Sequence, residues 1–505
     1  MNTGKVWLVG AGPGDTGLLT LKGKQVLDEA EVVVYDSLVG EGILAMIPQS
    51  ARAINVGKRA GHHTMPQEQI NEVLLKEAQN GYRVVRLKGG DPFIFGRGGE
   101  ELDLLEQYGI PYEIVPGITS AAAVPAYNGI PVTHRDFCSS LHLITGHKRQ
   151  GKGYDIDFEA LVRTKGTLVF LMGLSALGDI CAGLIEAGMD PFMPAAVLQK
   201  GTTARQKRVI ATVATLKEEA DAQGIEAPAI IVVGKVCELS ERFAWYEKLP
   251  LSGIRVLLTR PKKRMSVMAD RLRRQGAEVL ELPAIETRKC QDMSALREAF
   301  EHLNDYQWIA FTSPAGVEVF FEELAEVNRD IRSLAGCRIA AIGGGTAKAL
   351  RERGILADLM PERYDGDALG RLLAEQAEEN ARILLPRSAI GGKEILERLA
   401  ERKDITVDEI ATYDTVYPKQ TALDTAGLFG PDGVDFAVFT SASTVRGFEA
   451  AAPGVDCSQI TAACIGAQTA AEADRLGMRT YISEQASIDS VVELVIELSR
   501  AKKGL

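Results

Sequence analysis

Two glycine clusters in the N-terminal half follow apolar segments that have the composition of β-strands. The first is Gly10-Ala11-Gly12-Pro13-Gly14-Asp15, and the second runs from Lys88 to Glu101 as KGGDPFIFGRGGEE. Because glycine has no side chain, it allows the backbone to turn sharply and to approach a ligand closely. The two clusters therefore predict a site where a small molecule lies against the main chain.

A dinucleotide site is the first alternative for this region. Asp36, which ends the apolar segment EVVVYD, stands where a ribose-binding carboxylate would stand in a dinucleotide enzyme. The glycine spacing is GxGxG rather than GxGxxG, however, and Pro13 has no amide hydrogen to offer a phosphate. These departures disfavour a dinucleotide as the ligand.

The elements that must position these residues alternate between glycine-punctuated apolar strands and amphipathic helices along the whole chain. Such alternation predicts α/β domains with largely parallel sheets, in which ligands bind beyond the carboxyl ends of the strands. The pattern breaks at ERFAWYEKLPLSG, residues 241–253, before a new strand begins at Arg255. Phe243, Trp245 and Tyr246 indicate that this linker is packed against a domain.

The C-terminal half contains an internal repeat. RVLLTR at residues 255–260 is similar to RILLPR at 382–387, and IAFTSPAGVEVFFE is similar to AVFTSASTVRGFEA. A third pair, beginning at Arg338 and Ile460, follows in the same order. The repeat predicts two homologous α/β lobes that face each other over a cleft.

Composition excludes several classes of protein. A formal net charge of −11 disfavours a nucleic-acid partner, and no apolar run is long enough to span a membrane. The first residues enter a strand without a signal-peptide pattern, so we expect a cytoplasmic protein. The seven cysteines are scattered and form no CxxC pair, which predicts reduced thiols and no metal site.

The motifs VGAGPGD, YDSLV, VGKRAGHH, KGGDPFIFGRGGEE, PGITSA and GIPVTHR occur in that order. Together they resemble the tetrapyrrole methylase family, specifically uroporphyrinogen-III C-methyltransferase, over about residues 4–245. The resemblance implies a fold of two α/β subdomains and S-adenosyl-L-methionine as the cofactor. It implies cofactor contacts at Pro13, Gly89, Gly90, Asp91, Ile94, Thr119, Ser120, Met172, Gly201 and Ala229. Ser120 stands where the family commonly has alanine.

The same resemblance makes Asp36 a general base and Lys58 an acid or a substrate-binding cation. An electron-rich pyrrole carbon attacks the methyl group of a sulfonium ion, so catalysis depends on positioning and on later removal of a proton. The alternatives are a turn or helix-capping role for Asp36 and a solvated surface charge for Lys58.

Uroporphyrinogen is a polycarboxylate, so an acidic protein needs a local basic island to bind it. The candidates are cationic or titratable side chains, each of which has a structural role as its alternative. They are Lys58, Arg59, His62, His63, Arg97, His134, Arg135 and Arg149.

The repeated FTS and IGxxTA segments resemble uroporphyrinogen-III synthase over about residues 253–500. That family has a bilobal α/β fold with a discontinuous first lobe. The implied cleft residues are Arg260, Thr312, Ser313, Thr346, Arg387, Tyr413, Ser441 and Thr469, of which the hydroxyl residues have N-capping as the alternative. Tyr413 matches a tyrosine proposed to help hydroxyl departure from hydroxymethylbilane. Pro314 replaces a residue that is usually polar.

These resemblances predict the domain organisation. We expect methylase subdomains at about 1–115 and 116–245, a linker at 246–253 and a synthase at 254–505. Lobe one of the synthase would comprise about 254–287 and 418–505, and lobe two about 288–417.

The implied activity is bifunctional. The C-terminal half would close hydroxymethylbilane to uroporphyrinogen III with inversion of ring D, and the N-terminal half would add two methyl groups to give precorrin-2. Homodimerisation through the methylase half follows from the resemblance alone. The alternatives are a different methylase substrate, namely a later corrin, diphthine or a ribosomal RNA nucleotide, and a C-terminal half that senses tetrapyrroles without catalysis.

Overall fold

The structure is a computed structural model that describes residues 3–57, 65–146, 156–259, 266–282, 286–416, 427–430 and 433–504. Its internal contacts divide the chain into two units. The first comprises Met1–Ala284 and Lys419–Leu505, and the second comprises Ile285–Pro418. The chain therefore leaves the first unit, forms the second and returns.

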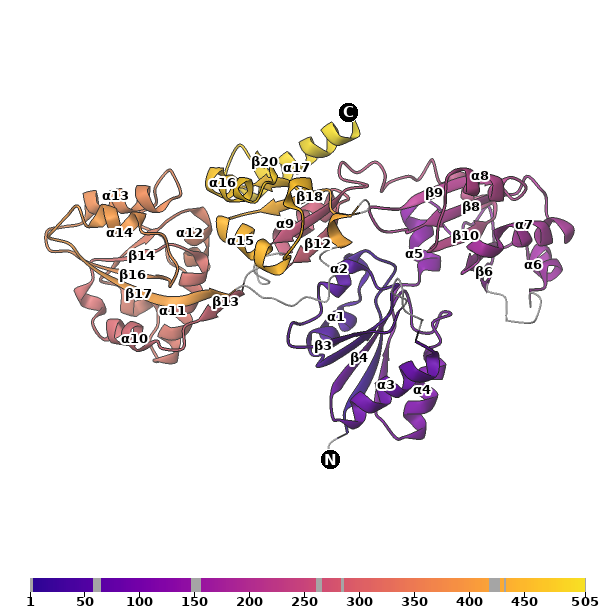
Figure 1. Ribbon diagram of the computed structural model, residues 1–505, viewed down its shortest axis with the longest axis horizontal. Helices are drawn as coiled ribbons and strands as arrows, with labels where there is room; N and C mark the ends of the chain where they lie inside the picture. Colours follow the sequence, from indigo (N-terminus) through magenta and orange to yellow (C-terminus); the bar gives the residue numbers. More distant parts are fainter. Residues whose placement is uncertain are drawn as a thin grey trace. The chain divides into compact units, whose positions relative to one another are not determined.

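The first sheet of the first unit is parallel and has the order β3-β2-β4-β1-β5. Its strands are β1 (Lys5–Gly10), β2 (Val32–Tyr35), β3 (Arg52–Asn55), β4 (Arg83–Lys88) and β5 (Tyr112–Val115). Its helices are α1 (Leu21–Asp28), α2 (Glu41–Leu44), α3 (Gln67–Gln79) and α4 (Gly98–Gln107). Helices α3 and α4 lie side by side next to β4 (Figure 1). The apolar runs in β1, β2 and β4 are buried, as expected for a parallel sheet covered by helices.

The second sheet of this unit is mixed, with the order β6-β7-β10-β8-β9. Its strands are β6 (Leu141–Thr145), β7 (Thr167–Leu171), β8 (Pro194–Gln199), β9 (Lys207–Thr212) and β10 (Ala229–Val233). Its helices are α5 (Ser120–Tyr127), α6 (Phe158–Thr164), α7 (Leu177–Glu186) and α8 (Leu216–Ala222). Strand β10 is antiparallel to both β7 and β8, so the start of β10 lies at the same edge as the ends of its neighbours.

The third sheet combines segments that are far apart in the sequence. Its order is β12-β11-β18-β19-β20, and all its pairs are parallel. The strands are β11 (Arg255–Thr259), β12 (Glu278–Leu282), β18 (Phe436–Phe439), β19 (Thr461–Cys464) and β20 (Arg479–Ile482). The helices are α9 (Ser266–Arg274), α15 (Ala442–Ala451), α16 (Ala467–Arg475) and α17 (Ile488–Lys503). The pairing of β11 with β18 confirms the predicted discontinuous first lobe.

The second unit contains one sheet, with the order β13-β17-β16-β14-β15. Its strands are β13 (Glu286–Lys289), β14 (Trp308–Phe311), β15 (Arg338–Ala341), β16 (Arg382–Ser388) and β17 (Thr406–Val416). Its helices are α10 (Ser294–Glu301), α11 (Pro314–Glu326), α12 (Gly344–Arg351), α13 (Gly366–Gln376) and α14 (Glu394–Leu399). Only β13 is antiparallel, and it forms a ladder with β17 next to both crossings between the units.

The internal repeat is visible in the strand orders. The run β16-β14-β15 in the second unit corresponds to β11-β18-β19 in the first, and both runs are parallel. The matching FTS segments follow β14 and β18 in the two sheets. The predicted pair of α/β lobes is therefore confirmed.

The linker around Trp245 is packed, as its aromatic residues predict. Tyr246 is buried, and its hydroxyl donates to the carbonyl oxygen of Gly276 at 3.1 Å. The indole of Trp245 donates to the carbonyl oxygen of Ala126 at 3.0 Å and meets the ring of Tyr127 edge-on. These contacts join the linker to α5 on one side and to the third sheet on the other.

The remaining expectations from composition concern cysteines and membrane spans. All seven cysteines lie in described segments and are free thiols. None of the helices in the described part of the chain is long and apolar enough to cross a membrane.

Candidate functional site

Three glycines from three separate segments bring the main chain together at the carboxyl ends of β1, β4 and β5. A Cβ atom on Gly10 would lie 2.5 Å from Gly117, and one on Gly117 would lie 2.2 Å from the carbonyl oxygen of Gly90. Gly12 and Gly90 also exchange backbone hydrogen bonds of 3.1 and 2.8 Å. Any side chain at Gly10 or Gly117 would push these segments apart, so glycine is required for the arrangement.

Gly90 has open space where its neighbours have none. Its φ angle is +67°, and a Cβ atom would meet nothing closer than the amide nitrogen of Ser120 at 3.8 Å. The predicted cofactor residues Pro13, Gly89, Ile94 and Thr119 lie in the same loops, beyond the strand ends. This edge can admit a ligand against the main chain.

Asp91 organises these loops through its carboxylate. One oxygen accepts hydrogen bonds from the amides of Phe93 and Ile94 at 2.8 and 3.2 Å. The other accepts from the amide of Gly117 at 3.1 Å. These contacts tie the loop after β4 to the loop after β5, and the cofactor contact expected at this carboxylate stays a prediction.

The other predicted cofactor residues lie at one edge of the second sheet. Met172 follows β7, Gly201 follows β8, and Ala229 begins β10. Met172 has a φ angle of +55° and is half exposed. A Cβ atom on Gly201 would lie 2.3 Å from the side chain of Val124, so this glycine lets the loop after β8 pack on α5.

Contacts between loops connect the predicted cofactor residues of the first sheet with those of the second sheet. The amide of Asp15, in the first glycine cluster, donates to the hydroxyl of Thr202 at 3.2 Å. The carboxylate of Asp15 accepts from the hydroxyl of Tyr127 at 2.7 Å, and burial together with this carboxylate raises the pKa of Tyr127. The structure therefore brings the GPGD loop, α5 and the loop after β8 together, and the cofactor contacts of these segments stay a prediction.

Asp36 stands directly after β2 and forms two interactions. One carboxylate oxygen accepts from the amide of Leu38 at 3.1 Å, which is the turn role considered as an alternative. The other lies 3.4 Å from the guanidinium of Arg86, and a quarter of the side chain is exposed. The carboxylate is thus held from one side by a buried cation and remains accessible from the other.

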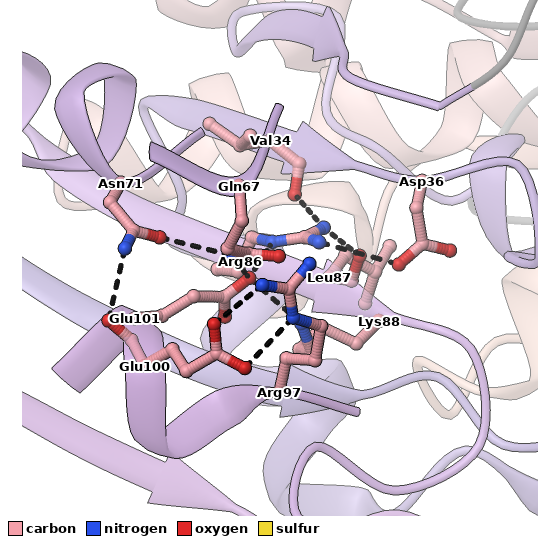
Figure 2. Close-up of polar contacts among 10 residues, drawn as sticks. All are labelled: Val34, Asp36, Gln67, Asn71, Arg86, Leu87, Lys88, Arg97, Glu100 and Glu101. Atoms are coloured by element: carbon pink, nitrogen blue, oxygen red, sulfur yellow. Dashed lines mark hydrogen bonds and ion pairs between the residues drawn. The ribbon is translucent and has the colours of Figure 1, made fainter. Parts of the chain in front are cut away.

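Arg86 belongs to a cluster of charges buried between β4 and α4 (Figure 2). Its Nε donates to Oε1 of Glu101 at 3.0 Å, and the ammonium of Lys88 donates to the same oxygen at 2.8 Å. Burial, and then the positive charge of Arg86, lowers the pKa of Lys88 although Glu101 opposes the shift. Arg86, Lys88 and Glu101 were not predicted as site residues. The available signal was the strand RVVRLK, in which Arg86 and Lys88 are two residues apart and therefore lie on the same face of a buried strand.

The predicted basic island is only partly described. Arg97 lies at the start of α4 and pairs with Glu100 at 2.5 Å, with about half of each side chain exposed. His134 packs against Phe137, and Arg135 is exposed next to it. Lys58, Arg59, His62, His63 and Arg149 lie outside the described residues. The basic island therefore stays a prediction.

In the second unit, Ser313 and Tyr413 come together. Ser313 follows β14 and Tyr413 lies on β17, and their hydroxyl oxygens are 2.7 Å apart. Ser313 also caps α11 by accepting from the amide of Gly316 at 2.9 Å, and Pro314 occupies the first helical position, where proline is favourable. Tyr413 is 7% exposed, so the pair is nearly enclosed.

The other predicted cleft residues have structural partners. Ser441 caps α15 through a capping box with Thr444, which is the alternative role considered for it. Thr346 and Thr469 are buried at equivalent positions in the first turns of α12 and α16. The guanidinium of Arg387 is buried and donates to Glu409 at 2.7 Å, so its charge is already neutralised.

Two further predictions concern the same half of the chain. Thr312 lies at the end of β14 beside Ser313, and Arg260 lies outside the described residues. Over the described ranges, no group of three or more potential metal ligands is found.

We predict that Asp91→Asn loosens both loops that the carboxylate holds. An asparagine keeps one acceptor oxygen but turns an amide group toward backbone donors, which leaves a donor facing a donor. Hydrogen exchange measured by mass spectrometry should accelerate in peptides that cover 89–96 and 116–119. Asp190→Asn is the control, since the carboxylate of Asp190 accepts from the amide of Phe192 in an exposed turn. Unchanged exchange in Asp91→Asn would contradict this role.

Comparison with known proteins identifies relatives of both halves. Residues 5–217 match the family model of tetrapyrrole (corrin/porphyrin) methylases, and residues 266–493 match that of uroporphyrinogen-III synthase HemD. A crystal structure of uroporphyrin-III C-methyl transferase from Thermus thermophilus, complexed with S-adenyl homocysteine, shares 40% sequence identity. It covers 46% of this chain and 99% of that chain, with a TM-score of 0.40.

Two curated relatives extend beyond one half. The uroporphyrinogen-III C-methyltransferase of Bacillus subtilis is 42% identical over 357 residues, which are 70% of this chain and 73% of that protein. The porphyrin biosynthesis protein HemD of Ruminiclostridium josui is 45% identical over 498 residues, which are 99% of each protein. Since this similarity runs along the whole chain and both family models match it in order, the chain belongs to the proteins that join a tetrapyrrole methylase to a uroporphyrinogen-III synthase.

Proposed function

We propose that the chain is a bifunctional enzyme that makes uroporphyrinogen III and then methylates it. The observation that carries this proposal is the 45% identity to a porphyrin biosynthesis protein over 99% of both chains. Residues 1–245 would form the methyltransferase, 246–253 the linker and 254–505 the synthase. The whole chain would convert hydroxymethylbilane to precorrin-2.

S-adenosyl-L-methionine supplies an electrophilic methyl group in this proposal. The residues present fit such a molecule, because the open side of Gly90 and the half-exposed side chains of Ile94 and Met172 offer backbone and apolar contacts. The chain's own task is then to hold the pyrrole carbon in line with the methyl group and to accept a proton afterwards. Asp36 is suited to accept it, because its carboxylate is fixed by Leu38 and Arg86 yet partly accessible.

In the synthase, the Ser313–Tyr413 pair is suited to assist departure of a hydroxyl group. Tyr413 would donate its proton to the leaving oxygen, which departs as water, and Ser313 would orient the phenol. The tetrapyrrole closes through a spiro intermediate that inverts ring D. The main task of the cleft is therefore to hold the linear cation, which remains when the hydroxyl group leaves, in the conformation that closes. This is consistent with a sequence in which this half shows no nucleophile–base pair, metal cluster or phosphate loop.

The test of the two activities uses the intact chain. Hydroxymethylbilane alone should give the type III isomer of uroporphyrinogen, and addition of S-adenosyl-L-methionine should then give the dimethylated product. A chain that yields only the type I isomer, which forms spontaneously, would instead contain the non-catalytic sensor considered above. A chain that methylates another tetrapyrrole but not uroporphyrinogen III would contain a different methylase.

We predict that Asp36→Asn abolishes most methylation while leaving cofactor binding unchanged. Asparagine keeps the shape and can accept from Leu38, but it cannot take up a proton, and a general base typically contributes ~10²-fold or more. Turnover of uroporphyrinogen III and calorimetry with S-adenosylhomocysteine measure the two effects separately. Asp28→Asn is the control, because Asp28 pairs with Lys24 on the exposed face of α1. Wild-type turnover in Asp36→Asn would remove Asp36 from the mechanism.

We predict that Tyr413→Phe slows isomer formation by ~10-fold or more and leaves methylation of added uroporphyrinogen III unchanged. The substitution removes one hydroxyl and leaves the ring in place. Tyr306→Phe is a matched control in the same unit, because the buried Tyr306 donates to Asp408 at 2.6 Å. An equal loss in both variants would indicate general destabilisation of the unit rather than a role in the reaction.

We further propose that the protein is a homodimer through its methylase half. Light scattering of the full chain at micromolar concentration should give twice the chain mass of 54.5 kDa. A monomer at this concentration would contradict the proposal.

A further inference from the structure

We propose that Glu101, which touches no reacting atom, is a positioning residue for the base Asp36 and acts through Arg86. The inference rests on the role of Asp36 proposed above. The carboxylate of Glu101 is fully buried on α4, whereas Asp36 lies in the loop after β2. Arg86 on β4 joins the two (Figure 2).

Glu101 fixes the orientation of the Arg86 guanidinium. Its Oε1 accepts from Nε of Arg86 at 3.0 Å, while one terminal nitrogen of the guanidinium donates to the carbonyl oxygen of Leu87 at 3.0 Å. The remaining nitrogen is thereby directed toward Asp36, at 3.4 Å. Because the guanidinium is planar, two fixed edges determine where the third edge points.

Glu101 also balances the charge around the base. The charged groups that face Arg86 are Asp36 from the loop after β2, Lys88 on β4 and Glu101 on α4, while α3 contributes the neutral amide of Gln67 to Glu101. Two cations are thus matched by two carboxylates. Without the charge of Glu101, Asp36 would be the only carboxylate in the cluster and would be drawn onto Arg86, away from the substrate.

The arrangement of the Glu101 oxygens favours this role over a purely structural one. The three donors, Gln67, Arg86 and Lys88, converge on Oε1, and Oε2 has no hydrogen-bond partner among the described residues. A carboxylate whose purpose was only to neutralise buried cations would gain from sharing them between both oxygens. Convergence on one oxygen instead places Arg86 and Lys88 at fixed positions.

The experiment compares full-length Glu101→Gln with the wild type in methylation of uroporphyrinogen III. We expect kcat to fall by ~10-fold or more, since a misplaced catalytic group can cost up to about 10²-fold. The affinity for S-adenosylhomocysteine should stay within about twofold, because no cofactor-loop contact changes. The loss should therefore appear in kcat and not in cofactor affinity, because the substitution displaces the base and leaves the cofactor loops in place.

Glu77→Gln is the matched control. Glu77 is a buried glutamate on α3 that pairs with Arg52, so its loss also leaves a cation without its partner. This pair does not belong to the cluster of Arg86, Lys88 and Glu101 beside Asp36. Glu77→Gln should lower the melting temperature and keep the wild-type kcat. If Glu101→Gln behaves in the same way, Glu101 is structural and the proposal is wrong.

A double-mutant cycle tests whether Glu101 acts through Arg86. In an Arg86→Lys background, which keeps the charge but loses the planar fork, Glu101→Gln should cost much less than in the wild type. Additive losses would overturn the proposal. If Glu101→Gln does not fold, the charge-balanced variant Glu101→Gln/Lys88→Met removes one buried charge of each sign and should show the same fall in kcat. Normal turnover in that variant would also overturn it.

The outcomes separate this inference from the proposed function. Wild-type methylation in Asp36→Asn would refute the role of the base itself. An inactive Asp36→Asn together with a wild-type kcat in Glu101→Gln would refute only the positioning role of Glu101.

Discussion

The close approach of three backbone segments at Gly10, Gly90 and Gly117 is the constraint on which the methylase site depends. Their α-carbons and carbonyl groups occupy the space that side chains would fill at other positions. This contact places the loops after β1, β4 and β5 at one edge, and Asp91 then ties two of these loops together. The glycines therefore shape the site by excluding side chains, and the carboxylate stabilises the shape that results.

Electrostatics at this site differ from those of the protein as a whole. The chain carries a net charge of −11, yet Arg86 and Lys88 are buried beside Asp36 and Glu101 in a cluster of matched charges. Buried ions of this kind cost desolvation energy, and removal of one partner typically costs about 3–5 kcal/mol. Such a cluster contributes orientation to the site, because each charge fixes the position of its neighbour.

The synthase lobes use hydroxyl groups where the methylase uses charges. Ser313 and Ser441 cap the helices that follow β14 and β18, and Thr346 and Thr469 are buried in the first turns of the next helices. The repeat is thus conserved in its capping as well as in its strand order. Ser313 differs from Ser441 in also meeting the hydroxyl of Tyr413. One repeat therefore carries a serine–tyrosine pair suited to chemistry, while in the other the hydroxyl of Ser441 meets that of Ser443 in the same capped helix.

The sequence by itself determined the α/β class, the two lobes and the relationship to both families, because these depend on periodicity and on motifs that are local in the chain. It also identified the glycine loops and Asp36, which stand at strand ends. Only the tertiary structure showed that Arg387 is neutralised by Glu409 and that Asp91 holds two loops. Only it showed that Glu101 reaches Asp36 through Arg86, because these three residues lie on separate elements and their distances follow from packing rather than from spacing in the chain.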